Sequence, residues 1–229
     1  MIGIIGAMDL EIEALEALLT DKKTEKYAGI TFSSGVLFGQ KTVLAVCGIG
    51  KVFAAMCTQA MILKYAPAAI INIGVAGTLT EKLDVGDIAL AESLVCHDMD
   101  TTALGDVRGL ISGLGLVNIP TDETLTDCLY GSCRAEGAKV LRGVIASGDR
   151  FVASKEEKEE IGRSFNAIAC EMEGQAIGQV CFSNGVPFAV MRSVSDSLTG
   201  GAMDYERFKY MAAERTAHAV KRLMIRLNG

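Results

Sequence analysis

The sequence has few aromatic rings and few of the residues that mark special sites. Its 229 residues include no tryptophan, five tyrosines, eight phenylalanines, three prolines and two histidines. Basic charge is also in short supply, because 22 lysines and arginines stand against 28 acidic residues and leave a net charge of −6. A protein that clamps nucleic acid usually presents a basic face. We therefore expect no nucleic-acid partner.

Long apolar runs are missing as well. No uninterrupted run approaches the roughly 18–20 residues that a membrane-spanning helix needs, and the N-terminal segment reaches Asp9 and Glu11 too early for a secretory signal. The seven cysteines form no CxxC pair, and most of them, such as Cys47 and Cys170, lie in apolar runs. Such cysteines are typical of small core residues in a reducing compartment. These features predict a cytoplasmic protein with no membrane partner.

The common phosphate, dinucleotide and zinc motifs are absent too. The segment 47–51 ends in Gly-Lys, but Ala45 and Val52 stand where a P-loop requires Gly and Ser or Thr. Phe53 replaces the third glycine of a dinucleotide-binding loop, and no HExxH pair occurs. The segment 97–100 (HDMD) has ligand-type residues but is more typical of a turn. We expect no metal site.

Glycine and small apolar residues are abundant, with 25 glycines and 50% hydrophobic residues, which excludes a disordered chain. Several short apolar runs are continuous rather than alternating, as in strands covered on both faces. The predicted strands are 2–6, 30–37, 41–47, 69–74, 87–95, 140–147, 166–170 and 187–194. The predicted helices are 9–20, 51–66, 121–136, 154–164, 172–185 and 204–227. This alternation predicts a single α/β domain over residues 1–229, with three layers: a mixed, mostly parallel central sheet flanked by helices.

Acidic side chains follow several of the predicted strands, where ligands bind in open α/β sheets. These acids are Glu11, Asp149, Glu171, Glu173 and Asp196. Such a cluster has three interpretations: a hard-cation site, a general acid and base, or stabilisation of a substrate that becomes positive. Acids early in helices also complement the helix dipole. We favour this last role for Glu171 and for the run 155–160.

Eight segments occur in an order that resembles one family. They are GIIGAM followed by Glu11, CGIGKV (47–52), INIGVAG (71–77), VGDIAL (85–90), HDMD (97–100), SGDRF (147–151), CEMEG (170–174) and RSVSD (192–196). Together they resemble the 5′-methylthioadenosine/S-adenosylhomocysteine nucleosidases of the purine nucleoside phosphorylase-like superfamily. The resemblance implies a homodimer that hydrolyses the N-ribosidic bond of 5′-thio-substituted adenosines. The products are adenine and a thioribose, and no metal or organic cofactor takes part.

The same resemblance implies roles for three acids. Asp196 matches the general acid that protonates adenine N7, Glu11 the base that activates water, and Glu173 the carboxylate that binds the ribose hydroxyls. A carboxyl that donates a proton near neutral pH needs a raised pKa. We expect the apolar strand before Asp196 to supply it by burial. We expect the helix dipole to hold Glu11 ionised.

Further positions match parts of the family's substrate pocket. Met172 and Phe151 match residues packed around ribose and base, and the backbone of Val152 matches one that hydrogen-bonds the adenine. The remaining matches are Met8 and Ile49 as lining residues, Tyr205 where the family tends to have Phe, and Ser195 and Arg192 as supports of the acid and the water site. Val75 stands where many members have Ser. The segment 101–120, which in the family helps build the 5′-substituent pocket across the dimer, departs from the usual pattern.

Three alternatives stay open on the residues alone. A phosphorylase of the same superfamily would need arginines for phosphate, but the first arginine in the chain is Arg108. A nucleosidase for another adenine nucleoside, such as a futalosine-type substrate, would use the same acids. A non-catalytic nucleoside-binding module would be expected to have lost at least one of them.

Overall fold

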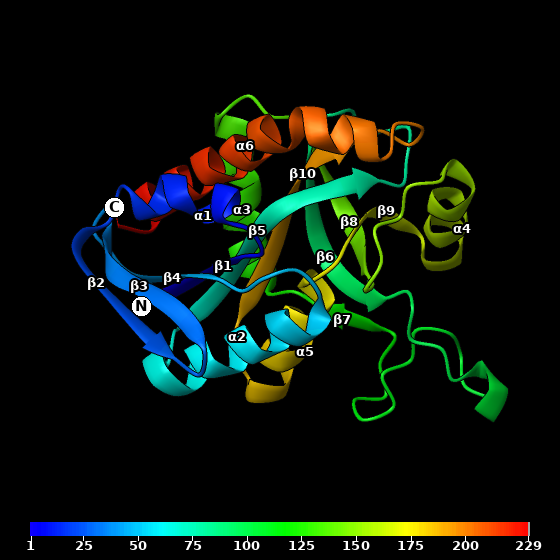
Figure 1. Ribbon diagram of the computed structural model, residues 1–229, viewed down its shortest axis with the longest axis horizontal. Helices are drawn as coiled ribbons and strands as arrows, with labels where there is room; N and C mark the ends of the chain where they lie inside the picture. Colours follow the sequence, from blue (N-terminus) through cyan, green and yellow to red (C-terminus); the bar gives the residue numbers. More distant parts are fainter. Residues whose placement is uncertain (229) are drawn as a thin grey trace.

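The structure is a computed structural model that describes residues 1–228. A mixed sheet of ten strands runs through it, with helices on both sides (Figure 1). The strands are β1 (Ile2–Gly6), β2 (Thr20–Tyr27), β3 (Ile30–Leu37), β4 (Gln40–Val46), β5 (Ala69–Thr78), β6 (Ile88–Cys96), β7 (Asn118–Pro120), β8 (Val140–Ser147), β9 (Ala167–Glu171) and β10 (Phe188–Asp196). The helices are α1 (Asp9–Glu16), α2 (Lys51–Tyr65), the short 3₁₀ helix η1 (Thr102–Leu104), α3 (Glu123–Ala135), α4 (Lys155–Phe165), α5 (Gly174–Asn184) and α6 (Ala202–Asn228).

The strand order is β10-β6-β8-β9-β5-β1-β4-β3-β2, with β7 paired to β6 and β10 also paired to β5. In the middle of the molecule β4, β1, β5 and β10 pair in parallel, whereas the hairpin strands β2 and β3 add antiparallel pairs. Every residue of β10 is buried, as expected for a strand covered on both faces. The predicted α/β class and three-layer architecture are confirmed.

The core lies on both faces of the sheet. On one face the strands pack against α2 and α5, through residues such as Met61 and Ile177. On the other face they pack against α1, α3 and α6, through residues such as Leu15, Leu129 and Leu223. In Figure 1 the helices α2 and α5 lie below the sheet and α1, α3 and α6 above it. None of the helices in residues 1–228 combines the length and apolar character that crossing a membrane demands.

The structure corrects one predicted element and adds two strands. The helix predicted over 9–20 ends at Glu16, and the chain then forms β2, whose residues are all exposed. This edge strand needs no apolar face because its backbone pairs with β3, and its lysines suit an unpaired edge. The strand β7 has only three residues, too few for any periodic signal. Neither change moves the carboxyl ends of β1, β5, β9 and β10, where the site forms.

Candidate active site

A cavity of about 370 Å³ opens at the carboxyl ends of β1, β5, β9 and β10, beneath the start of α6. All but two of the predicted site residues line it, and the exceptions are Val152 and Arg192. Its lining residues are Ala7, Met8, Glu11, Ile49, Val75, Ala76, Gly77, Phe151, Cys170, Glu171, Met172, Glu173, Ser195, Asp196, Ala202, Tyr205 and Glu206. The cavity therefore brings together acids from four segments far apart in the sequence.

Glu11 is a buried carboxylate held by backbone amides. It lies in the first turn of α1, where one oxygen accepts from the N–H groups of Ala7 (2.7 Å) and Met8 (3.0 Å). The other oxygen accepts from the N–H of Val75 at 3.1 Å. Burial raises the pKa of Glu11, although Arg192 and these three amides act in the opposite direction. Burial thus acts against the helix dipole that we expect to hold Glu11 ionised, and the raised pKa makes Glu11 a stronger base.

Glu173 caps the start of α5 and faces the glycine loop after β4. Its carboxylate accepts from the N–H of Gly50 at 2.8 Å. Burial raises the pKa of Glu173 to about 7, and the nearby carboxylate of Glu171 adds to the rise. A carboxyl group with such a pKa changes charge in the range where enzymes work.

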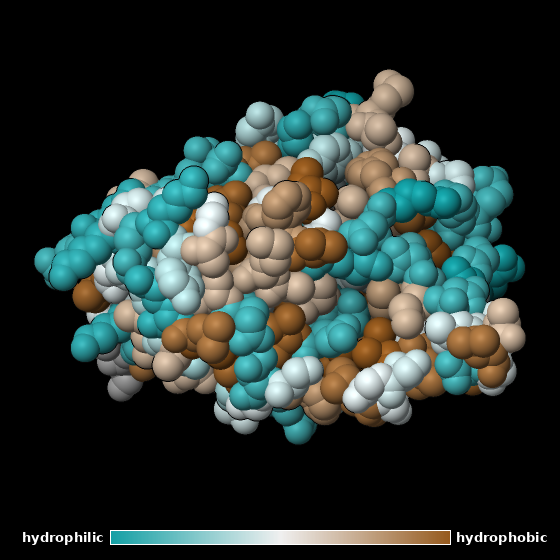
Figure 2. All heavy atoms as spheres, turned by 60° about the horizontal axis from the view of Figure 1, so that its bottom comes forward, coloured by the Kyte–Doolittle hydropathy of each residue, from teal (hydrophilic) through white to brown (hydrophobic). Residues whose placement is uncertain are grey.

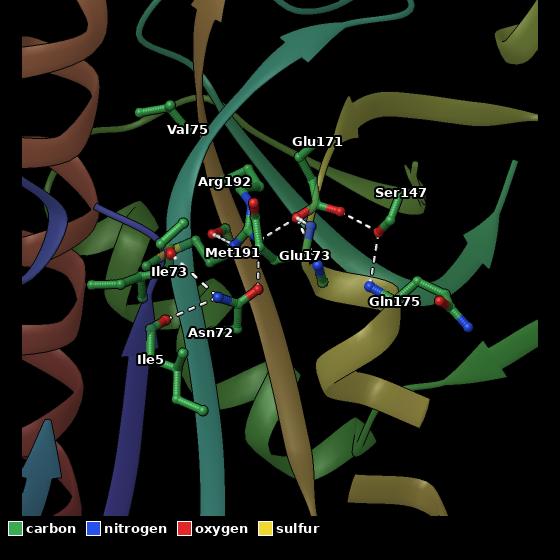
Figure 3. A network of polar contacts seen from close by, with 12 residues as sticks. Ile5, Asn72, Ile73, Val75, Ser147, Glu171, Glu173, Gln175, Met191 and Arg192 are labelled. Carbon is green, nitrogen blue, oxygen red and sulfur yellow. Dashed lines mark hydrogen bonds and ion pairs between the residues drawn. The ribbon is translucent and has the colours of Figure 1, made fainter. Parts of the chain in front are cut away.

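Glu171, which lines the cavity, forms a buried ion pair with Arg192, which does not line it (Figure 3). Arg192 donates to the Glu171 carboxylate and to Asn72, which in turn donates to the backbone oxygen of Ile5 at 2.9 Å. Glu171 also accepts from the N–H groups of Glu173 and Gly174, at 3.0 and 2.7 Å. Its contact with the first turn of α5 agrees with the helix-terminus role expected for it. Arg192 supports the site from behind and does not reach the cavity itself.

Asp196 lies at the end of β10 and is 2% exposed, but its surroundings are not the apolar ones expected. The ammonium group of Lys158 lies 2.5 Å from its Oδ2 atom, and the Ser195 hydroxyl lies 3.0 Å from its Oδ1 atom. Lys158 belongs to the run 155–160 at the start of α4, for which only a helix-dipole role was expected. Its side chain is fully buried and pairs with Asp196, a contact outside that expectation. Asp196 is therefore buried as expected, but a charged side chain lies beside it.

Two glycines of β5 make room for the carboxylates. A Cβ atom at Gly74 would lie 2.6 Å from Glu11 Oε1, and one at Gly77 would lie 2.7 Å from Asp196 Oδ2. Both distances are shorter than any ordinary carbon–oxygen contact. The glycines of the segment INIGVAG therefore allow the Glu11 and Asp196 side chains to approach the strand closely.

Aromatic rings and apolar side chains form the more open part of the cavity. Phe151 and Tyr205 meet edge to face, with ring centroids 5.4 Å apart, and the Tyr205 hydroxyl donates to the sulfur of Met8 at 3.2 Å. Val152 instead packs its side chain into a separate cluster with Leu79. A flat base could lie against the Phe151 and Tyr205 rings.

One member of the predicted acidic cluster, Asp149, lies outside the cavity. Asp149 accepts from the backbone N–H of Lys51 at 2.8 Å and does not line the cavity. Asp98, from the HDMD segment, pairs with the side chain of Lys51 and accepts from the N–H of Asp149 at 2.8 Å. In the part of the chain that the structure describes, no group of three or more potential ligand side chains is arranged to hold a metal ion.

Comparisons with known proteins show the family of the chain. The model of the phosphorylase superfamily matches residues 1–225. A 5′-methylthioadenosine/S-adenosylhomocysteine nucleosidase of Staphylococcus aureus is 38% identical, over 99% of this chain and all of the relative. The chain belongs to this nucleosidase family.

Solved structures show the same likeness. A nucleosidase of this family from Neisseria meningitidis, in complex with methylthio-immucillin-A, is 36% identical, with a TM-score of 0.94 over 98% of each chain. A futalosine hydrolase of Helicobacter pylori is 35% identical, with a TM-score of 0.92 over 97% of this chain and 96% of that one. The nucleosidase family to which the chain belongs thus shares its fold with a hydrolase named for a different nucleoside.

Proposed function

We propose that the protein hydrolyses the N-ribosidic bond of 5′-methylthioadenosine and S-adenosylhomocysteine, releasing adenine and a thioribose. The observation that carries the proposal is the convergence of Glu11, Glu173 and Asp196 on one cavity lined by two aromatic rings. Adenine leaves readily only when protonated, and the ribose then approaches a cation. Three carboxyl groups suit a substrate that becomes positive.

Each acid has a separate task in this reaction. Asp196 gives a proton to adenine N7, assisted by the Ser195 hydroxyl on its Oδ1 atom. Glu173 accepts hydrogen bonds from the ribose hydroxyls and stabilises the oxocarbenium ion by its charge. Glu11 takes the proton of the attacking water, a role that its raised pKa favours.

The remaining predicted residues hold the nucleoside in place. Phe151 and Met172 pack around the base and ribose, and the backbone of Val152 hydrogen-bonds the adenine edge. Tyr205 lies against Phe151, and Met8, Ile49 and Val75 also line the cavity. Arg192 acts from behind the cavity, where its charge lies near Glu11 and Glu173 and favours their ionised forms.

The charge of the cavity favours water over phosphate as the nucleophile. Among residues 1–228, the side chains that line the cavity include five carboxylates and no lysine or arginine. Arg192 is committed to Glu171 and Asn72. A phosphate dianion would need cationic side chains instead.

The test is adenine release from a panel of nucleosides, measured with and without phosphate. We expect methylthioadenosine and adenosylhomocysteine to be cleaved in phosphate-free buffer, with a free reducing sugar as the second product. Strict dependence on phosphate, with a sugar phosphate as product, would instead establish a phosphorylase. Binding of the nucleosides without turnover would establish a non-catalytic module.

A futalosine-type nucleoside is the second candidate substrate. The observation in its favour is the likeness to the Helicobacter pylori futalosine hydrolase, which is nearly as great as that to the Neisseria meningitidis nucleosidase. The three acids act on the ribose and on the adenine, so either substrate fits them. The nucleoside panel should therefore include an adenine-bearing futalosine analogue, and the ratio of kcat/KM values ranks the substrates.

We also propose that the enzyme is a cytoplasmic homodimer. Large apolar side chains are exposed along α2, among them Val52 (69%), Phe53 (56%) and Leu63 (70%). The face that carries α2 and α5 shows brown apolar patches between polar residues (Figure 2). The seven cysteines are all free, which suits a reducing compartment. Light scattering after gel filtration should give twice the 24.2 kDa mass of the chain.

A further inference from the structure

The lysine behind the candidate acid has no part in the reaction as described so far. Lys158 lies on α4, and its side chain is 0% exposed. Its Nζ atom lies 2.5 Å from Asp196 Oδ2 and donates to the backbone oxygen of Ser197 at 2.6 Å. Because Ser197 directly follows Asp196, one ammonium group holds both the carboxylate and the chain that carries it.

The burial of Lys158 is not a general property of its helix. Lysine is almost never fully buried unless it is paired, because its charge loses hydration. Lys155, three residues earlier on α4, is 50% exposed and forms an ordinary surface pair with Glu159 at 3.5 Å. Lys155 is thus half-exposed to solvent, whereas Lys158 is buried against the candidate acid.

The ion pair between Lys158 and Asp196 determines which group holds the proton that adenine receives. A carboxylate paired with an ammonium group has no proton of its own to give, although the pair as a whole holds one. The forms Lys–NH₃⁺ with Asp–COO⁻ and Lys–NH₂ with Asp–COOH carry the same total charge, and a dry site favours the neutral form. Substrate that displaces water from the cavity therefore promotes transfer of the proton from nitrogen to the carboxyl group.

We propose that Lys158 is a positioning residue that supplies Asp196 with the proton for the adenine base, an inference that rests on the proposed nucleosidase function. A proton passes from Lys158 Nζ to Asp196, and one passes from Asp196 to adenine N7. The electron pair of the C1′–N9 bond moves onto the base at the same time. A water oxygen bonds to C1′ and its proton goes to Glu11.

The charges balance over this sequence. Adenine and the thioribose leave neutral, Asp196 is again a carboxylate, Lys158 is neutral and Glu11 is protonated. Exchange with solvent then removes the proton from Glu11 and returns one to Lys158. The enzyme is restored without any oxidant, metal or second substrate.

Two substitutions separate proton supply from simple positioning. Lys158→Met removes both the charge and the proton, whereas Lys158→Arg keeps a cation that does not give up its proton. We expect both variants to lower kcat for adenine release from methylthioadenosine at least about 10-fold, with KM within about 3-fold of wild type. Wild-type kcat in either variant would overturn the inference. Full recovery by arginine alone would show that Lys158 only positions the acid.

A substrate with a better leaving group gives a second readout. In 4-nitrophenyl 5-methylthio-β-ribofuranoside the phenolate leaves without a proton, so we expect both variants to cleave it within about 3-fold of wild type. A loss as large as that on methylthioadenosine would indicate a distorted site and overturn the inference. Lys155→Met is the control for changes on α4, and thermal unfolding checks that each variant is folded. Failure of the proposed function would appear separately, as no adenine release by the wild-type enzyme.

Discussion

The two ends of the cavity hold carboxylates that are equally buried but have opposite partners. Glu11 and Asp196 are each 2% exposed. Glu11 accepts hydrogen bonds from three backbone amides, whereas Asp196 lies against the ammonium group of Lys158. An amide hydrogen stays on its nitrogen, but an ammonium group can transfer one. Burial alone therefore does not distinguish the base from the acid. The hydrogen-bonding partner of each carboxylate distinguishes them.

The same strand shapes both ends. β5 has Gly74 beside Glu11 and Gly77 beside Asp196, three residues apart. The N–H of Val75 contributes directly to Glu11, and the Ser195 hydroxyl lies 3.3 Å from the oxygen of Ala76. The backbone of β5 thus helps to position both acids, although their chemistry differs.

Replacing the acid at the lysine end should have the largest effect. We expect Asp196→Asn to lower kcat for adenine release at least about 10³-fold, because the amide cannot pass a proton to N7. KM should change much less, since the aromatic and ribose contacts persist. Steady-state kinetics on methylthioadenosine measures both constants.

The control for this variant is its stability. Asn leaves the ammonium group of Lys158 buried without a negative partner, which we expect to destabilise the fold. Urea unfolding and nucleoside binding should therefore be measured beside the kinetics. Turnover within about 10-fold of wild type in a folded variant would contradict the acid role.

Replacing the base at the amide end should have the next largest effect. Glu11→Gln keeps one acceptor oxygen for the backbone amides but places an NH₂ group against the remaining N–H donors. We expect kcat to fall about 10²-fold, because water then loses its proton acceptor. Kinetics and circular dichroism on the same sample distinguish loss of the base from loss of the helix cap. A variant that unfolds without any specific kinetic defect would show that Glu11 serves only α1.

The sequence predicts the two acids but not the lysine that pairs with Asp196, and the reason is physical. Glu11 follows β1 directly and Asp196 ends β10, so a rule about strand ends finds both acids. The amides that hold Glu11 come from its own turn and from the neighbouring strand. Lys158, however, lies 38 residues before Asp196 in a polar helical run. No local pattern distinguishes this lysine from its exposed neighbours, because only the tertiary packing of α4 turns it inward.

The fold shows the same contrast between local and distant information. Continuous apolar runs predicted β1, β5 and β10 because a strand buried on both faces needs them. The exposed edge strand β2 has no such requirement, and its sequence TDKKTEKY has no apolar face to signal a strand. Its existence depends on backbone pairing with β3, which the local sequence does not encode.

Substituting one glycine of β5 at a time should displace one of the two carboxylates and leave the other in place. Gly77→Ala would place a methyl group 2.7 Å from Asp196 Oδ2, and Gly74→Ala would place one 2.6 Å from Glu11 Oε1. We expect each to lower kcat about 10-fold or more by displacing a carboxylate. The Gly77 variant should spare the 4-nitrophenyl riboside, which needs no acid, whereas the Gly74 variant should lose both substrates. The same loss on both substrates in both variants would indicate general distortion of β5.

The smallest expected effect concerns Glu173, which lines the same cavity. Burial and the Glu171 carboxylate raise its pKa to about 7, from its ordinary value of 4.5. Between these two values the folded protein keeps a proton that the unfolded chain has lost, so this group destabilises the fold progressively as the pH rises through that window.

Glu173→Gln removes the titration. We therefore expect its free energy of unfolding, relative to wild type, to increase by about 1–3 kcal/mol between pH 5 and pH 8. Urea unfolding at both pH values measures the difference. The control is Glu206→Gln, which removes an exposed carboxylate that lines the same cavity. A difference for Glu173→Gln that is independent of pH would show that Glu173 is ionised across the whole range and that burial does not hold a proton on it.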